Sequence, residues 1–188
     1  MPIVRLLVLA RQILPLLERT NRRIVCAESC TAGLVSAALA GIPGASQWLC
    51  GSAVVYRNAT KTAWVGVAGE ILDDPERGDV CEETAIQMAE GVLAVTPEAS
   101  VAISVTGHLG PGAPAGSDGV LYIGWAERKG CDTEQATIYC ERVELGLTPP
   151  LHRHDVPRRV ARQTEASQNV LRVIRDRLDE IARAVSLD

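Results

Sequence analysis

One serine lies where a predicted strand meets a predicted helix. Residues 24–27 form a short apolar strand, and a polar turn that carries Ser29 and Thr31 is expected to lead into an apolar helix that runs to about residue 39. The first backbone N–H groups of a helix have no partner within it and lie at the positive end of its dipole. A hydroxyl placed there can act as a nucleophile beside ready donors for an oxyanion. The alternative is that Ser29 or Thr31 only caps the helix.

Tyr56 and Lys61 follow the next predicted strand, at 46–56. The sequence has no Asp–His pair suited to a serine triad, but a lysine or tyrosine beside a serine can move the proton instead. Burial lowers the pKa of a lysine into the range that this role needs. The alternatives are that Lys61 is a surface lysine at a helix start, and that Tyr56 is a core residue at a strand end with its hydroxyl in water.

A glycine-rich loop at 106–112 follows the β-branched strand expected at 101–105. It matches neither the dinucleotide-binding pattern nor a P-loop. Its glycines permit positive φ angles and let backbone N–H groups approach an anion, whereas the alternative is a tight loop between strands. Ligand crevices in open α/β sheets form outside the carboxyl ends of strands. If these strand ends are adjacent, the three polar segments share one pocket.

The order of the expected elements predicts an α/β protein, specifically a three-layer α/β/α sandwich with a mixed, partly parallel sheet. The remaining elements are an amphipathic helix near the N-terminus, a short helix after residue 61, a helix at 82–95, adjacent strands at 120–126 and 137–143, a loop at 145–157 and a long helix from 158 to about 184. The 188 residues are expected to form one domain, 1–188, with its core at about 5–183.

Composition excludes several classes of function. Aromatic residues make up 3% of the chain and the net charge is −4, which argues against nucleic-acid binding. No apolar run is long enough to span a membrane, and the N-terminal helix reads as amphipathic rather than as an export signal. The 6 cysteines lack a zinc-ligand spacing, so we expect reduced thiols in a cytoplasmic protein with no metal.

Together the polar segments resemble the CinA C-terminal domain family. The matching stretches are 27–33 (AESCTAG), 56–61 (YRNATK), 106–111 (TGHLGP) and 42–46 (IPGAS), with Gly91 in the corresponding helix. The resemblance covers practically the whole chain and implies a stand-alone domain that forms a homo-oligomer. Members of this family are nicotinamide mononucleotide deamidases. They hydrolyse the carboxamide of this small pyridine nucleotide to nicotinate mononucleotide and ammonia, without a cofactor.

The resemblance implies that Ser29 is the nucleophile and that Lys61 and Tyr56 transfer its proton. The residues expected to line the substrate pocket are Cys30, Thr31, Gly33, Asn58, Thr106, Gly107 and Gly110. From the residues themselves, we expect the phosphate to meet an arginine at the start of the last helix, where backbone N–H groups also favour an anion. The candidates there are Arg158, Arg159 and Arg162.

Four features depart from the family pattern. Ala32 replaces a glycine, Cys81 replaces a serine, the loop after Gly112 is shorter and lacks a Lys-Pro-Val-Gly stretch, and residues 145–157 replace a Gly-Asp-Arg segment. A basic residue would be expected in that last segment, near the phosphate. The alternative function is therefore a catalytically diverged nucleotide-binding paralogue with a regulatory or partner-binding role.

Overall fold

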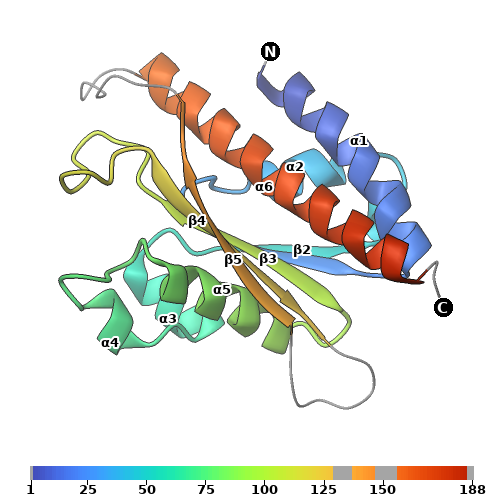
Figure 1. Ribbon diagram of the computed structural model, residues 1–188, viewed down its shortest axis with the longest axis horizontal. Coiled ribbons are helices and arrows are strands. Elements are labelled where there is room, and N and C mark those ends of the chain that lie inside the picture. The colour runs from blue at the N-terminus through green and yellow to red at the C-terminus, as the bar shows by residue number, and fades with distance from the viewer. Residues whose placement is uncertain (1, 129–136, 147–155, 186–188) are drawn as a thin grey trace.

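A five-stranded sheet lies between two layers of helices in the computed structural model, which describes residues 2–128, 137–146 and 156–185 (Figure 1). The elements are α1 (Pro2–Thr20), β1 (Ile24–Glu28), α2 (Leu34–Ala40), the 3-10 turn η1 (Ala45–Gln47), β2 (Leu49–Val54), α3 (Asn58–Val65), α4 (Gly69–Leu72), α5 (Glu82–Ala94), β3 (Val101–Gly107), β4 (Val120–Glu127), β5 (Thr137–Glu144) and α6 (Val156–Val185). The expected α/β class is confirmed, as is the order of elements apart from α4, which was not expected; the short helix expected after residue 61 begins earlier, at Asn58.

The sheet is mixed, as predicted, with strand order β2-β1-β3-β4-β5. β1 runs parallel to both of its neighbours, whereas β4 is antiparallel to β3 and to β5. Glu28, the last residue of β1, lies opposite Val54 of β2 and Val105 of β3. The carboxyl ends of three strands therefore meet at one edge, and the segments that follow them lie side by side there.

Helices cover both faces of the sheet (Figure 1). α1, α2 and α6 pack together on one face, and α5 lies on the other face against four strands with α3 and α4 beside it. Alternate residues of the strands point into the two cores, as the pleat requires. Ile103 belongs to the core under α6, whereas its neighbour Ala102 belongs to the core under α5.

Gly91 allows α5 to approach α3 closely. A Cβ atom at this position would lie 1.7 Å from the carbonyl oxygen of Val65, at the end of α3. Only a residue without a side chain fits such a contact. This packing fixes the position of α3, which carries Lys61.

The polar turn expected between β1 and the next helix is confirmed, and α2 begins after it, at Leu34. Residues 30–33 form this turn, in which Ala32 and Gly33 adopt positive φ angles of 51° and 93°. This is the left-handed region, which ends regular structure and which glycine enters at least cost. Ala32 thus adopts a conformation that a glycine would enter at lower cost.

Two other boundaries differ from expectation. The strand expected at 46–56 is shorter, because η1 occupies its first part and the strand proper is Leu49–Val54. The last helix begins at Val156 rather than at 158. Most of the loop expected at 145–157 lies outside the described residues. Within the described part of the chain, no helix is long and apolar enough to cross a membrane.

Candidate active site

Glu28 organises the turn that carries Ser29. Its buried carboxylate accepts a hydrogen bond of 2.8 Å from the Thr31 hydroxyl. Its other donors are the backbone N–H groups of Gly33 at 2.9 Å, Val35 at 3.2 Å and Ser36 at 2.9 Å, and the Ser52 hydroxyl at 3.2 Å. One carboxylate thus satisfies the start of α2, where a negative charge is also favoured by the helix dipole.

This arrangement corrects two expectations about Ser29. The serine does not cap α2, and neither does Thr31, whose hydroxyl donates to Glu28 instead. The N–H groups at the start of α2 are also unavailable as oxyanion donors, because Glu28 occupies them. The Ser29 hydroxyl makes no hydrogen bond with another described residue, although its backbone N–H donates to Val105 at 3.0 Å.

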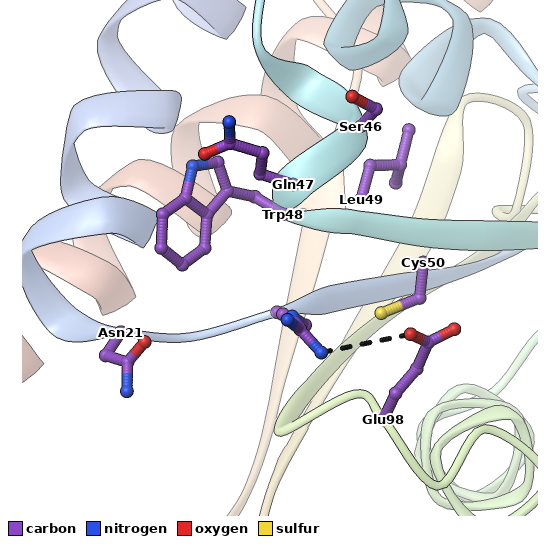
Figure 2. Close-up of a pocket in the computed structure, with 8 residues that line it drawn as sticks. Asn21, Ser46, Gln47, Trp48, Leu49, Cys50 and Glu98 are labelled. Carbon is purple, nitrogen blue, oxygen red and sulfur yellow. Dashed lines mark ion pairs between the residues drawn. The ribbon is translucent and has the colours of Figure 1, made fainter.

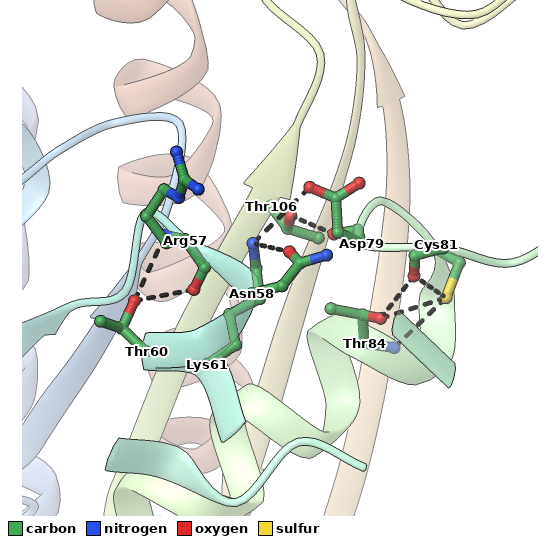
Figure 3. Close-up of polar contacts among 9 residues, drawn as sticks. Arg57, Asn58, Thr60, Lys61, Asp79, Cys81, Thr84 and Thr106 are labelled. Atoms are coloured by element: carbon green, nitrogen blue, oxygen red, sulfur yellow. Dashed lines mark hydrogen bonds and ion pairs between the residues drawn. The ribbon is translucent and has the colours of Figure 1, made fainter. Parts of the chain in front are cut away.

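Lys61 is a buried lysine at the same edge of the sheet. Its side chain is 1% exposed, and Nζ lies 3.7 Å from Oδ2 of Asp79 and 3.5 Å from Oδ1 of Asn58 (Figure 3). Burial lowers its pKa below the ordinary value, although the nearby carboxylate of Asp79 opposes the shift. Lys61 is therefore not a surface lysine, and it gives up its proton more readily than a free lysine does.

Asp79 was not anticipated from the sequence, because it belongs to the loop before α5. Its backbone carbonyl accepts a hydrogen bond of 2.6 Å from the Thr106 hydroxyl (Figure 3). On its other side, Cys81 caps α5 by accepting the backbone N–H of Thr84 at 3.4 Å. The loop is thus tied both to β3 and to α5, which places the Asp79 carboxylate beside Lys61.

Tyr56 lies at the mouth of the site with its ring 51% exposed. The alternative that it is a core residue is therefore wrong. Its hydroxyl accepts a hydrogen bond of 2.9 Å from Nη2 of Arg159 in α6, and Arg159 also donates to the Gly110 carbonyl. The contact joins the segment after β2, the glycine loop and the start of the last helix.

Arg162 and Gln163 of α6 bind two other segments: Asp118 before β4 and the turn after β1. Arg162 is 1% exposed, and its guanidinium donates to both carboxylate oxygens of Asp118, at 2.7 and 3.1 Å. The amide nitrogen of Gln163 donates to the carbonyls of Cys30 at 3.2 Å and Thr31 at 3.3 Å. Of the three candidate arginines, Arg162 is thus buried against Asp118, whereas Arg158 is exposed and Arg159 is half-buried.

Cys30, the residue after Ser29, is a buried thiol. Burial raises its pKa to about 12, so it stays neutral near pH 7 and does not compete as a nucleophile. The positive charges of Lys61 and Arg159 act in the opposite direction on this pKa.

The glycine loop contributes a close backbone contact at Gly107 and the imidazole of His108. Gly107 is required by the sheet, since a Cβ there would lie 2.6 Å from the Cβ of Leu121. His108 is half-buried, and burial lowers its pKa despite the carboxylates of Asp79 and Asp118. Its ring is therefore neutral near pH 7. Among the described residues, no group of three His, Cys, Asp or Glu side chains could hold a metal ion.

A separate cavity of about 510 Å³ lies near the opposite ends of β1 and β2. Its lining includes Trp48, Cys50 and the exposed ion pair of Arg23 with Glu98 (Figure 2). Residue 23 precedes β1, whereas Ser29 follows it, so this cavity is not part of the candidate active site.

The described cysteines, including Cys50, are all free thiols, and Cys131 lies outside the described residues.

Comparison with known proteins agrees with this fold. The chain matches the family model of the CinA C-terminal domain over residues 7–145. A competence/damage inducible protein from Agrobacterium tumefaciens has a crystal structure that superposes with a TM-score of 0.77 at 26% identity, over 93% of this chain and 96% of that one. A protein from Klebsiella pneumoniae has the same fold, with a TM-score of 0.78 at 22% identity over 93% and 97%. The chain therefore belongs to the CinA C-terminal domain family.

Curated relatives are longer than this chain. A CinA-like protein from Dictyoglomus thermophilum is 34% identical over 78% of this chain and 36% of its own length. A CinA-like protein from Myxococcus xanthus is 40% identical over 59% of this chain and 26% of its own length. The chain thus corresponds to about a quarter to a third of each of these relatives.

Proposed function

We propose that this protein hydrolyses the carboxamide of a pyridine mononucleotide, converting nicotinamide mononucleotide to nicotinate mononucleotide and ammonia. The observation that carries the proposal is the burial of Lys61 at the edge of the sheet where Ser29 lies. A buried lysine is costly to the fold, and its lowered pKa lets it give up its proton more readily than an ordinary lysine, which is what activation of a serine requires.

In this mechanism the Ser29 hydroxyl oxygen attacks the carboxamide carbon. Neutral Lys61, assisted by Tyr56, takes the hydroxyl proton and then delivers it to the departing nitrogen, so that the C–N bond breaks and ammonia leaves. Water then hydrolyses the ester formed on Ser29. The oxyanion needs donors other than the start of α2. The backbone N–H groups of Cys30 and Thr31, which make no hydrogen bond with another described residue, are suited to this role.

The phosphate of the substrate would meet Arg158 or Arg159. Both belong to the first turn of α6, and Arg159 already contacts Tyr56 and the glycine loop, on which Thr106, Gly107 and Gly110 lie. A guanidinium binds a phosphate through charge-assisted hydrogen bonds. We also propose that the protein forms a homo-oligomer.

The second candidate is a nucleotide-binding protein without catalysis. The observation in its favour is that the Tyr56 hydroxyl is occupied by Arg159, a residue next to the segment where the family pattern is lost. Such a protein would bind the nucleotide and leave its amide intact.

The two candidates are separated by measuring ammonia release and binding with three compounds: nicotinamide mononucleotide, its riboside and free nicotinamide. If the protein is a hydrolase, it should release ammonia from the nucleotide. Its kcat/KM should be lower for the riboside and lower again for free nicotinamide. Binding of the nucleotide without ammonia would establish the second candidate. Neither binding nor ammonia would contradict both.

A further inference from the structure

Gln163 contacts the turn of Ser29 from the opposite end of the chain. Its amide nitrogen lies 3.2 Å from the carbonyl oxygen of Cys30 and 3.3 Å from that of Thr31. Both partners are acceptors, so the NH₂ group, and not the amide oxygen, faces the turn. The two hydrogen bonds fix two successive peptide groups from one side chain.

The two peptide groups differ at their other ends. A trans peptide is planar, and its N–H points away from its C=O, so fixing the carbonyl also fixes the direction of the N–H. The peptide that begins at the Thr31 carbonyl ends at the N–H of Ala32, which donates to the Ser29 carbonyl at 3.1 Å. The peptide that begins at the Cys30 carbonyl ends at the N–H of Thr31, which has no hydrogen-bond partner among the described residues.

We infer that Gln163 is a positioning residue that holds the Thr31 N–H as a preoriented oxyanion donor. The inference rests on the proposed amide hydrolysis. Glu28 orders the turn from the other side but engages the Thr31 side chain and the N–H groups from Gly33 onward, so it leaves this peptide to Gln163. A preoriented donor stabilises a developing oxyanion without reorganisation during the reaction.

The nature of the contact suggests two informative variants. Gln163→Ala removes both hydrogen bonds and leaves the peptide free to rotate. Gln163→Glu keeps the size and helix propensity of the side chain but turns a carboxylate toward two carbonyl oxygens, which repels them. Gln163→Glu is therefore expected to be at least as impaired as Gln163→Ala. Gln168→Ala is the matched control, since Gln168 lies on α6 and makes no hydrogen bond with the turn.

The test measures how fast a fluorophosphonate labels Ser29, by mass spectrometry of the intact protein. In that reaction the serine oxygen bonds to phosphorus, fluoride leaves and the hydroxyl proton passes to the base, so the rate reports the nucleophile and its oxyanion donors without any amide substrate. Both Gln163 variants should label about 10- to 100-fold more slowly than wild type, the usual effect of a displaced catalytic group. In turnover of nicotinamide mononucleotide, kcat should fall by the same factor with KM unchanged, and the thermal midpoint should stay close to that of wild type and of Gln168→Ala.

The outcomes separate this inference from the proposed function. Labelling of both Gln163 variants at the rate of wild type and of Gln168→Ala would overturn the inference alone. A slower rate that is matched by a rise in KM or by a large drop in thermal midpoint would also overturn it, since that pattern indicates general loosening of the turn. Normal labelling of wild type without ammonia release would contradict the proposed substrate and not the role of Gln163. Wild type that neither labels nor releases ammonia would contradict both.

Discussion

The backbone N–H of Ser36 donates to the Glu28 carboxylate at 2.9 Å, so the last residue of β1 is tied to the first turn of α2. Ser29 lies in the loop that this bond closes. A helix start of this kind usually offers its N–H groups to a ligand, but here a buried glutamate takes them. If Ser29 is the nucleophile, as we propose, its oxyanion donors must come from the turn that precedes the helix.

Glu28→Gln is expected to destabilise the protein by about 3 kcal/mol, because a carboxylate that accepts several hydrogen bonds is replaced by an amide whose NH₂ faces N–H donors. Urea unfolding measures the change. Glu90→Gln is the control, since Glu90 is a partly buried glutamate of α5, outside the turn. A loss for Glu28→Gln no larger than that of the control would show that the carboxylate does not hold the turn.

Cys81→Ser is expected to stabilise the protein by about 0.5–1 kcal/mol, because serine is a much better N-cap than cysteine. The Cys81 sulfur now accepts the Thr84 N–H at 3.4 Å, and a hydroxyl oxygen makes a stronger bond at this position. The urea midpoint reports the gain, and Cys50→Ser, away from any helix start, should show none. A less stable Cys81→Ser protein would mean that the packing of the sulfur outweighs the cap.

Lys61→Met should abolish turnover and yet raise stability at neutral pH by about 1 kcal/mol, because it removes a buried ammonium and leaves Asp79, whose side chain is 44% exposed, to water. The lowered pKa sets the sign of the pH dependence. Below the folded-state pKa, wild type carries the cost of a buried ammonium, and this cost fades as pH rises toward the ordinary value of 10.5.

The advantage of Lys61→Met in urea unfolding should therefore be larger at about pH 6 than at about pH 10, close to the ordinary lysine value. Arg57→Met removes an exposed cation just before the same helix and is the control for charge alone. An advantage for Lys61→Met that is absent at every pH, or that grows with pH, would contradict the account of the lowered pKa.

Most of the fold was predictable because its elements have regular patterns. The β-branched strand at 101–105 and the amphipathic helix at 82–95 were both placed within two residues of their observed ends. The polar turn before α2 was also expected, but its conformation was not. The left-handed backbone of Ala32 and Gly33 delays the helix to Leu34, and an alanine gives no warning of such a conformation.

The candidate site was predictable only where its residues follow strands. Ser29, Tyr56 and Lys61 could be proposed because parallel strands end at one edge. The burial of Lys61 could not, since it depends on the loop of Asp79 and on α5 packing against α3. The contacts of Gln163 and Arg159 with this site span more than a hundred residues of sequence, and no local pattern encodes them.

Arg159→Ala and Arg162→Ala should fail in different ways. Loss of Arg159 should raise KM for the nucleotide by about 10- to 100-fold and scarcely change that for the riboside, if the guanidinium meets the phosphate. Loss of Arg162 should instead lower stability by about 3 kcal/mol, because it leaves Asp118 without its buried partner. Steady-state kinetics with both compounds and urea unfolding measure the two effects. A wild-type preference for the nucleotide in Arg159→Ala would place the phosphate elsewhere, with Arg158→Ala as the next variant.

The most direct measurement is the turnover of nicotinamide mononucleotide by wild type and Ser29→Ala in one ammonia assay. Because the Ser29 hydroxyl makes no hydrogen bond with another described residue, the substitution should change the free energy of unfolding by less than about 0.5 kcal/mol. Ammonia release should fall at least about 1,000-fold, as when other serine nucleophiles are removed. Wild-type release that survives in Ser29→Ala at more than about a tenth of its rate would contradict the account, because another group would then be the nucleophile.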